Sequence, residues 1–218
     1  MSFSAMRQQA KQERTDKRYA EAVRHYERLW EQYPDACDQW VGWEYADCLY
    51  RVQDYAGALA VCRSVYKQAS DFAHNRNLYG RCIYQLEMKA SEVKNSQQFL
   101  KAAKAITELT VQDPYSPYVK TVFKVVEYYK KNNHFDDMIM WLQKLDAENL
   151  SRTCGRFTNS EGQERELASD WEKYHSLYVK ALVMTKQYQA AIDASEKALA
   201  TITSFHYNND IWFKWYMA

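Results

Sequence analysis

The sequence predicts an all-α protein built from repeated helical hairpins, and three observations support this. First, the 218 residues include only three prolines and five glycines, while helix-favouring residues are plentiful. Second, apolar residues return at helical spacing on both sides of a short polar break at 53–54. Third, this two-helix pattern recurs along the chain. One such hairpin cannot bury both of its apolar faces, so the pattern predicts a stack of hairpins, an α-solenoid.

The clearest hairpin spans residues 38–65. A small residue stands where the two helices must approach closely, Ala46 in the first and Ala58 in the second. The surrounding apolar positions are Val41, Tyr45, Cys48, Leu49 and Val52 in the first helix, and Leu59, Cys62 and Val65 in the second. Both sets repeat every three or four residues, which is typical of amphipathic helices.

An aromatic residue opens each second helix, and a small or apolar residue follows three positions later. The five pairs are Tyr19 and Ala22, Tyr55 and Ala58, Phe99 and Ala102, Phe135 and Met138, and Tyr188 and Ala191. Pro34 and Pro114 follow the first and third of these helices, where proline stops a helix and lets the chain turn.

This pattern resembles the tetratricopeptide repeat, a family with a 34-residue helix-turn-helix unit. The small-residue place of the first helices is taken by Ala10, Ala46, Gly80, Val126 and Val179. The resemblance implies a right-handed α-solenoid, a single array over 1–218 with repeats at about 4–36, 38–70, 72–114, 117–150 and 169–203. Two intervals exceed the family period, and the extra residues fall at 89–97 and in an insertion at 151–168.

Two segments stand outside the five repeats. Residues 210–218 repeat the spacing of 38–46, which indicates the start of a sixth repeat at 208–218. This predicts that the 218 residues are the N-terminal portion of a longer protein. The alternative is a short cap over the last groove. The polar insertion 151–168 contains Gly155 and Gly162 and predicts a flexible loop, with a second contact site as the less favoured alternative.

The sequence gives no sign of an enzyme, and we expect no catalytic residues, no metal and no cofactor. The motifs GxxxxGK[ST], GxGxxG, HExxH and GxSxG are all missing. The five histidines lie in different repeats, so a shared site is not expected. Cys154, between Arg152 and Arg156, is a candidate reactive thiol, although an ordinary exposed thiol is the favoured interpretation.

The net charge and the cysteine content limit the expected cellular location and the expected partners of the protein. The net charge of +1 gives no overall field toward nucleic acid or membranes. Five cysteines without a CxxC pair, behind a polar N-terminus, predict reduced thiols in a cytoplasmic protein. No uncharged run approaches the length needed to span a membrane.

In this family the first helices line a concave groove, so the resemblance implies which side chains face it. Counting positions from the small residue of each first helix puts 11 Lys or Arg side chains in this groove. Only three acidic side chains, Glu44, Asp47 and Glu127, join them. The candidate partner-binding residues are Trp40, Trp43, Arg81, Tyr84, Lys120, Phe123, Lys124 and Lys131. Lys120 and Lys124 also match two cations of the family's carboxylate clamps, but Leu78 and Asp47 depart from that clamp, so chaperone-tail binding is not expected.

We therefore predict a non-catalytic adaptor or scaffold that binds an acidic peptide segment of another protein in a basic, aromatic groove. Further C-terminal residues of the same chain are a second expected partner. The alternative is the N-terminal arm of a larger protein that binds single-stranded nucleic acid, because bases stack on aromatic rings while phosphates follow Lys and Arg. A third, less favoured hypothesis is that the protein is an accessory to an enzyme and acts through the loop around Cys154.

Overall fold

The computed structural model describes residues 2–91, 95–201, 213 and 214, and it confirms the all-α helical repeat. The chain divides into two compact units, residues 1–121 and residues 122–218, which are described separately below. The hand of the solenoid and the single array over 1–218 stay predictions. No helix of the described residues is both long and apolar enough to cross a membrane.

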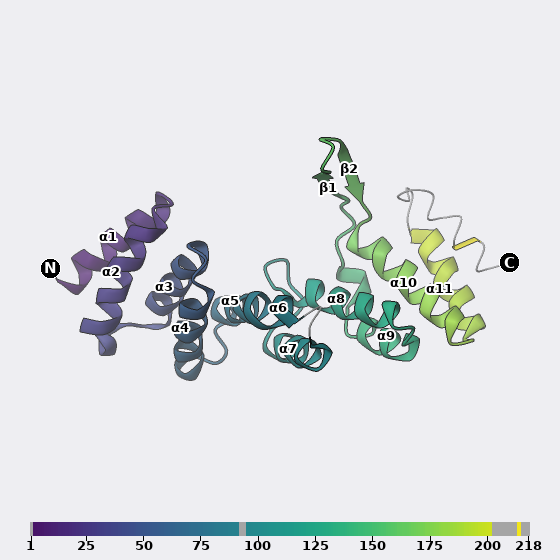
Figure 1. Ribbon diagram of the computed structural model, residues 1–218, viewed down its shortest axis with the longest axis horizontal. Helices are drawn as coiled ribbons and strands as arrows, with labels where there is room; N and C mark the ends of the chain where they lie inside the picture. Colours follow the sequence, from purple (N-terminus) through teal and green to yellow (C-terminus); the bar gives the residue numbers. More distant parts are fainter. Residues whose placement is uncertain (1, 92–94, 202–212, 215–218) are drawn as a thin grey trace. The chain divides into compact units, whose positions relative to one another are not determined.

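Unit 1, residues 1–121, consists of helical hairpins that follow one another along the chain (Figure 1). Its helices are α1 (Phe3–Thr15), α2 (Tyr19–Gln32), α3 (Gln39–Arg51), α4 (Tyr55–Gln68), α5 (Ala73–Ile83), α6 (Lys89–Ser91) and α7 (Ser96–Leu109), with a 3-10 turn at Pro34–Ala36. Helix α1 packs on α2 and α3 on α4, while α2 packs on α3 and α4 on α5. The first helices α1, α3 and α5 also contact one another in order, so they share one face of the unit.

The stretch 89–97, where the extra residues were expected, is helical at 89–91 and again from 96. Helix α5 continues into a π-helical segment, Tyr84–Met88, and then into α6. The backbone N–H of Lys89 donates to the carbonyl of Tyr84, five residues earlier, which is the mark of a π-turn. Residues 92–94 lie outside the described part of the chain.

Unit 2, residues 122–218, combines helical hairpins with one small sheet. Helix α8 (Tyr118–Lys131) crosses the boundary between the units; after it come α9 (Phe135–Leu142), a 3-10 turn (Ala147–Asn149), β1 (Gly155–Thr158), β2 (Glu164–Leu167), α10 (Asp170–Met184) and α11 (Tyr188–Thr201). Helix α10 packs on α9 and α11. The insertion 151–168 therefore forms a β-hairpin, which the sequence analysis did not predict. The expected sixth repeat lies outside the described residues, apart from 213 and 214.

The aromatic residues expected to open the second helices do so in four cases. Helices α2, α4, α9 and α11 begin at Tyr19, Tyr55, Phe135 and Tyr188. The exception is α7, which begins at Ser96 and not at Phe99. The reason is a cap: the side-chain oxygen of Asn95 accepts a hydrogen bond from the backbone N–H of Gln98 at 3.0 Å, so the helix starts one turn early.

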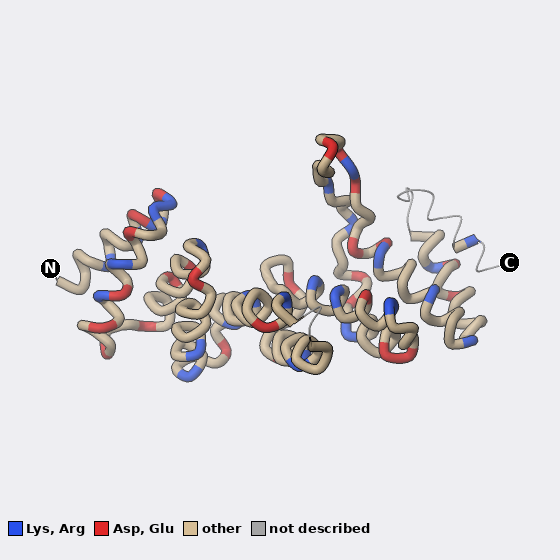
Figure 2. Tube along the Cα trace, viewed as in Figure 1, with Lys and Arg blue, Asp and Glu red and all other residues tan. Residues whose placement is uncertain are grey.

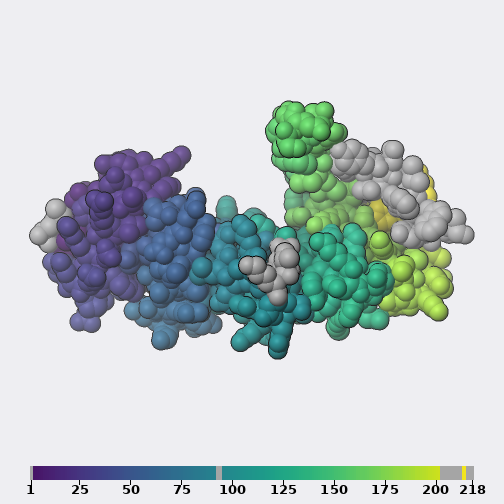
Figure 3. Space-filling model, viewed as in Figure 1, coloured from purple at the N-terminus to yellow at the C-terminus, as the bar shows by residue number. Residues whose placement is uncertain are grey.

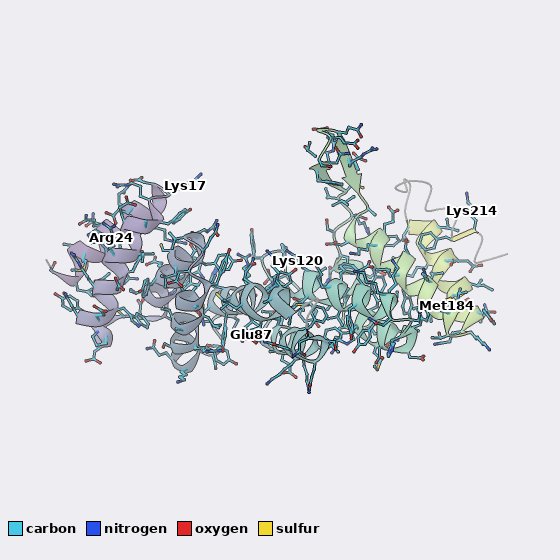
Figure 4. The ribbon with its side chains drawn as sticks, in the orientation of Figure 1. Lys17, Arg24, Glu87, Lys120, Met184 and Lys214 are labelled. Atoms are coloured by element: carbon cyan, nitrogen blue, oxygen red, sulfur yellow. The ribbon has the colours of Figure 1, made fainter. Side chains whose placement is uncertain are left out.

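One turn geometry joins the helices in four hairpins. Lys17, Gln53, Asn133 and Lys186 have φ of 61°, 67°, 58° and 61°, and each lies two residues before the aromatic residue that opens the second helix. After Gln53, the N–H of Asp54 donates to the carbonyl of Leu49 at 2.9 Å, the long hydrogen bond of a Schellman motif. Lys17 marks this turn between α1 and α2 (Figure 4).

The residues at the predicted small-residue places of the first helices are buried. Ala10, Ala46, Val126 and Val179 are fully buried. At Gly42, an added Cβ would stand 2.4 Å from Val65 Cγ2, so any larger residue at this position in α3 would force the Val65 side chain to shift.

Candidate partner-binding surface

Four aromatic rings gather on the first-helix face of unit 1, and we call them the aromatic cluster: Trp40, Trp43, Phe72 and His74. The centroid of the Trp40 ring lies 6.0 Å from Trp43, 4.7 Å from Phe72 and 5.3 Å from His74. Trp40 remains 43% exposed, although its neighbours hold it in place. The cluster therefore offers a large, fixed apolar side chain to solvent.

Local sequence signals position the aromatic cluster. The Asp38 carboxylate caps α3 by accepting a hydrogen bond from the N–H of Val41 at 2.8 Å, which sets Trp40 and Trp43 one turn apart on the same face. Phe72 is the residue that precedes α5. The sequence analysis missed Phe72, because counting positions inside each helix leaves out the residue before its start.

The three basic residues of α1 are all paired with acids on α3 or at its cap. Arg7 lies 3.5 Å from Asp38, Lys11 lies 3.5 Å from Glu44, and Arg14 lies 2.9 Å from Asp47, each measured between side-chain nitrogen and carboxylate oxygen. Acidic and basic residues are accordingly interspersed along these helices (Figure 2). The basic and acidic side chains on the surface between α1 and α3 thus neutralise one another.

Arg14 has the most developed of these contacts. Its Nε and Nη2 both donate to Asp47 Oδ2, at 3.1 and 2.9 Å, and its guanidinium carbon lies 4.8 Å from the centroid of the Trp43 ring. Asp47 is only 8% exposed and also accepts a hydrogen bond from Arg51 at 3.4 Å. Arg14 therefore fixes the inner side of the aromatic cluster.

A second group of predicted residues meets where α5 packs near the start of α8. The Lys120 ammonium lies 4.8 Å from the centroid of Tyr84, the first residue of the π-turn, and Tyr84 itself is 9% exposed. Arg81, one turn earlier, donates from Nη2 to the carbonyl of Tyr115. In the described part of the chain neither Arg81 nor Lys120 forms an ion pair with a carboxylate. We call Arg81 and Lys120 the unpaired cations, and Figure 4 labels Lys120.

In unit 2, a lysine likewise covers a buried aromatic ring. Phe123 is 5% exposed, and the Lys173 ammonium lies 4.7 Å from its centroid. Lys173 and Lys130 also lie 3.9 and 3.4 Å from the Glu127 carboxylate. Of the remaining predicted residues, Lys124 is half-buried and Lys131 is exposed.

Unit 2 also buries a histidine without hydrogen-bond partners in the described residues. Both ring nitrogens of His175 lack a partner, and its ring centroid lies 3.9 Å from that of Trp171. Burial, reinforced by Lys197, lowers the pKa of His175 from 6.5 to about 4. His175 is therefore a neutral packing residue at pH 7. Cys154 is exposed, as expected for a thiol in the insertion.

Solved structures of helical repeat proteins resemble the chain only distantly. MamA from Desulfovibrio magneticus RS-1 is 15% identical, with a TM-score of 0.47 and coverage of 91% of this chain and 93% of that chain. A thermophilic TPR protein from Thermus thermophilus is 13% identical, with a TM-score of 0.40 and coverage of 99% of both chains.

Comparison by sequence gives a more specific result. The search of the curated proteins found no match. Residues 14–82, which contain the aromatic cluster, match the family model described as "Tetratricopeptide repeat". The match supports a protein-interaction module, the kind of function that the sequence predicts. It also confirms, over residues 14–82, the resemblance to tetratricopeptide repeat proteins.

Proposed function

We propose that unit 1 binds an extended, acidic segment of another protein through the aromatic cluster and the unpaired cations. The observation that carries this proposal is the contrast among the cations of the first helices. Arg7, Lys11 and Arg14 already have carboxylate partners within the unit, whereas Arg81 and Lys120 have none among the described residues. An acidic side chain of a partner would supply the missing counter-charge at these two positions.

The aromatic cluster would supply most of the binding free energy. Exposed tryptophans with fixed neighbours are typical binding hot spots, because they bury much apolar area and lose little conformational freedom. Trp40 meets both conditions, since it is 43% exposed and touches Phe72 and His74. Tyr84 would act indirectly, by holding Lys120 in place. Phe123 lies in unit 2 and stays a prediction as a contact. Lys124 and Lys131 stay predictions as contacts.

Charge pairing makes a nucleic-acid partner the weaker alternative. Binding along a phosphate backbone needs several cations that are free to replace counterions. The pairs formed by Arg7, Lys11 and Arg14 reduce the number available on unit 1. A short acidic peptide needs only one or two such cations and an apolar anchor. The proposal also includes a continuous array of repeats, a cytoplasmic location and an acidic partner.

Capture of partners from source-cell lysate tests the proposal. The immobilised protein is compared with the double variant Arg81→Glu and Lys120→Glu, each with and without nuclease. The matched control is Lys67→Glu with Lys101→Glu, two exposed lysines on the second helices α4 and α7. We expect a protein that survives nuclease, is retained by the control and is lost with the double variant. Retention by the double variant, or loss on nuclease treatment, would overturn the proposal.

A further inference from the structure

The insertion 151–168 folds into a hairpin with a defined turn. The N–H of Asn159 donates to the carbonyl of Gln163 at 3.0 Å, and the N–H of Gly162 donates to the carbonyl of Asn159 at 3.0 Å. Gly162 has φ of 76°, as a three-residue turn with a bulge requires. Asn159 and Gln163 therefore form the hydrogen-bonded pair that closes the hairpin.

This closing pair determines which backbone groups face outward. The register pairs Thr158 with Glu164, Phe157 with Arg165, Arg156 with Glu166, and Gly155 with Leu167. Hydrogen-bonded and non-hydrogen-bonded pairs alternate in an antiparallel ladder. The backbone N–H and C=O groups of 156 and 158 on β1, and of 164 and 166 on β2, thus point away from the hairpin. In the described residues the sheet has only these two strands, so both edges are open.

The hairpin is fully exposed on both strands, and one face carries two apolar side chains beside Arg165. Phe157 is 46% exposed and Leu167 is 54% exposed, and the register puts both on the same face. The hairpin stands out from the helices of unit 2 in the space-filling view (Figure 3). A two-stranded sheet is marginally stable alone in water, so additional strands would stabilise it.

The β2 edge is unsuited to pairing with its own copy. Two copies of β2 can form backbone hydrogen bonds only in registers where residues 164 and 166, whose backbone groups face outward, lie opposite one another. Each such antiparallel register places like charges directly opposite one another: Glu164 against Glu164, Arg165 against Arg165, or Glu166 against Glu166. Opposed like charges destabilise a strand pair, so β2 is protected against self-association.

The β1 edge, by contrast, can pair with its own copy without placing like charges opposite one another. We propose that β1 pairs with β1 of a second copy of this chain, antiparallel and centred on Phe157. In this register Arg156 opposes the partner's Thr158, and the two Phe157 rings meet in a non-hydrogen-bonded pair, where side chains lie closest. The result is a four-stranded sheet in the order β2-β1-β1-β2. The contact is isologous and closes at a dimer, and the charged β2 edges end the sheet.

Disulfide trapping tests the register directly. In a Cys154→Ser background, which removes the exposed thiol, Phe157→Cys places two thiols on the dimer axis with Cα atoms about 4.5 Å apart. The matched control is Arg165→Cys on the same face, whose copies would be three strand spacings or about 14 Å apart, too far to bridge. We expect a covalent dimer from Phe157→Cys and none from Arg165→Cys. Equal cross-linking of the two variants, or none, would overturn the proposal.

Sedimentation equilibrium on the unmodified chain provides the second measurement. Thr158→Pro removes an outward-facing N–H from the β1 edge, and Glu164→Pro removes the equivalent N–H from the β2 edge. We expect a monomer–dimer equilibrium whose Kd rises about tenfold or more with Thr158→Pro, because two symmetric hydrogen bonds are lost, and stays unchanged with Glu164→Pro. A strict monomer, an equal effect of both prolines, or open-ended polymers from β1–β2 pairing would each contradict it.

Discussion

The ion pair between Arg14 and Asp47 gives the sharpest prediction for the compensated part of unit 1. Arg14 donates two hydrogen bonds to the Asp47 carboxylate, and each such bond to a charged group contributes about 1.5–3 kcal/mol. The Arg14 side chain is 28% exposed and Arg51 remains as a second donor to Asp47, both of which weaken the coupling. We therefore expect a coupling free energy of about 2 kcal/mol between the two side chains.

A double-mutant cycle measures this coupling. Arg14→Ala, Asp47→Ala and the double variant are compared with the unmodified chain by urea unfolding, followed by circular dichroism. The control is the same cycle on Lys104 and Glu108, an exposed pair 3.8 Å apart, where we expect less than about 0.5 kcal/mol. A coupling of Arg14 to Asp47 no larger than that of the surface pair would contradict the inference that ion pairs neutralise the surface between α1 and α3.

Three further predictions concern stability. Gly42→Ala should lower the free energy of unfolding by about 2 kcal/mol in urea unfolding, because its Cβ meets Val65 Cγ2 at 2.4 Å; an unchanged value would show that α4 can move away. Asp54→Ala should cost about 1 kcal/mol in the same assay, because the Asp54 carboxylate accepts the N–H of Gly57 at 2.9 Å and caps α4; a neutral effect would refute the cap. The lowered pKa of His175 means that the unfolded chain binds a proton first. Stability is therefore complete above pH 6.5 and falls by roughly 3 kcal/mol as the pH drops to about 4, and His175→Phe should remove this part of the pH dependence in urea unfolding.

Much of the fold was predictable because it depends on local signals. Apolar periodicity and the aromatic residues that open second helices located α2, α4, α9 and α11. The start of α7 was missed because the cap at Asn95 outweighs the repeat pattern there. The hairpin at 155–167 escaped because its strands are short and fully exposed, so they lack the apolar alternation by which a half-buried strand is recognised.

The chemistry of the surface was predictable only in part. Position counting brought Trp40, Trp43 and Lys120 to the first helices, where they lie. It could not show that Lys11 and Arg14 have acids as partners, because those acids lie on the next first helix, about one repeat away along the chain. Ion pairing between repeats depends on helix packing and side-chain reach, which residue counts do not contain. Within unit 1 the pairing leaves Arg81 and Lys120, the unpaired cations, as the basic side chains proposed for binding.

The affinity of unit 1 for its captured partner is the most direct test of the central claim. We would measure Kd by titration calorimetry for Trp40→Ala, Lys120→Ala and Lys11→Ala in the full chain. The account predicts that Kd rises at least about tenfold for Trp40→Ala and Lys120→Ala, because an anchor and an unpaired cation are lost. It predicts a change below about twofold for Lys11→Ala, whose ammonium already pairs with Glu44. The reverse order, with Lys11→Ala the most damaging, would contradict the account.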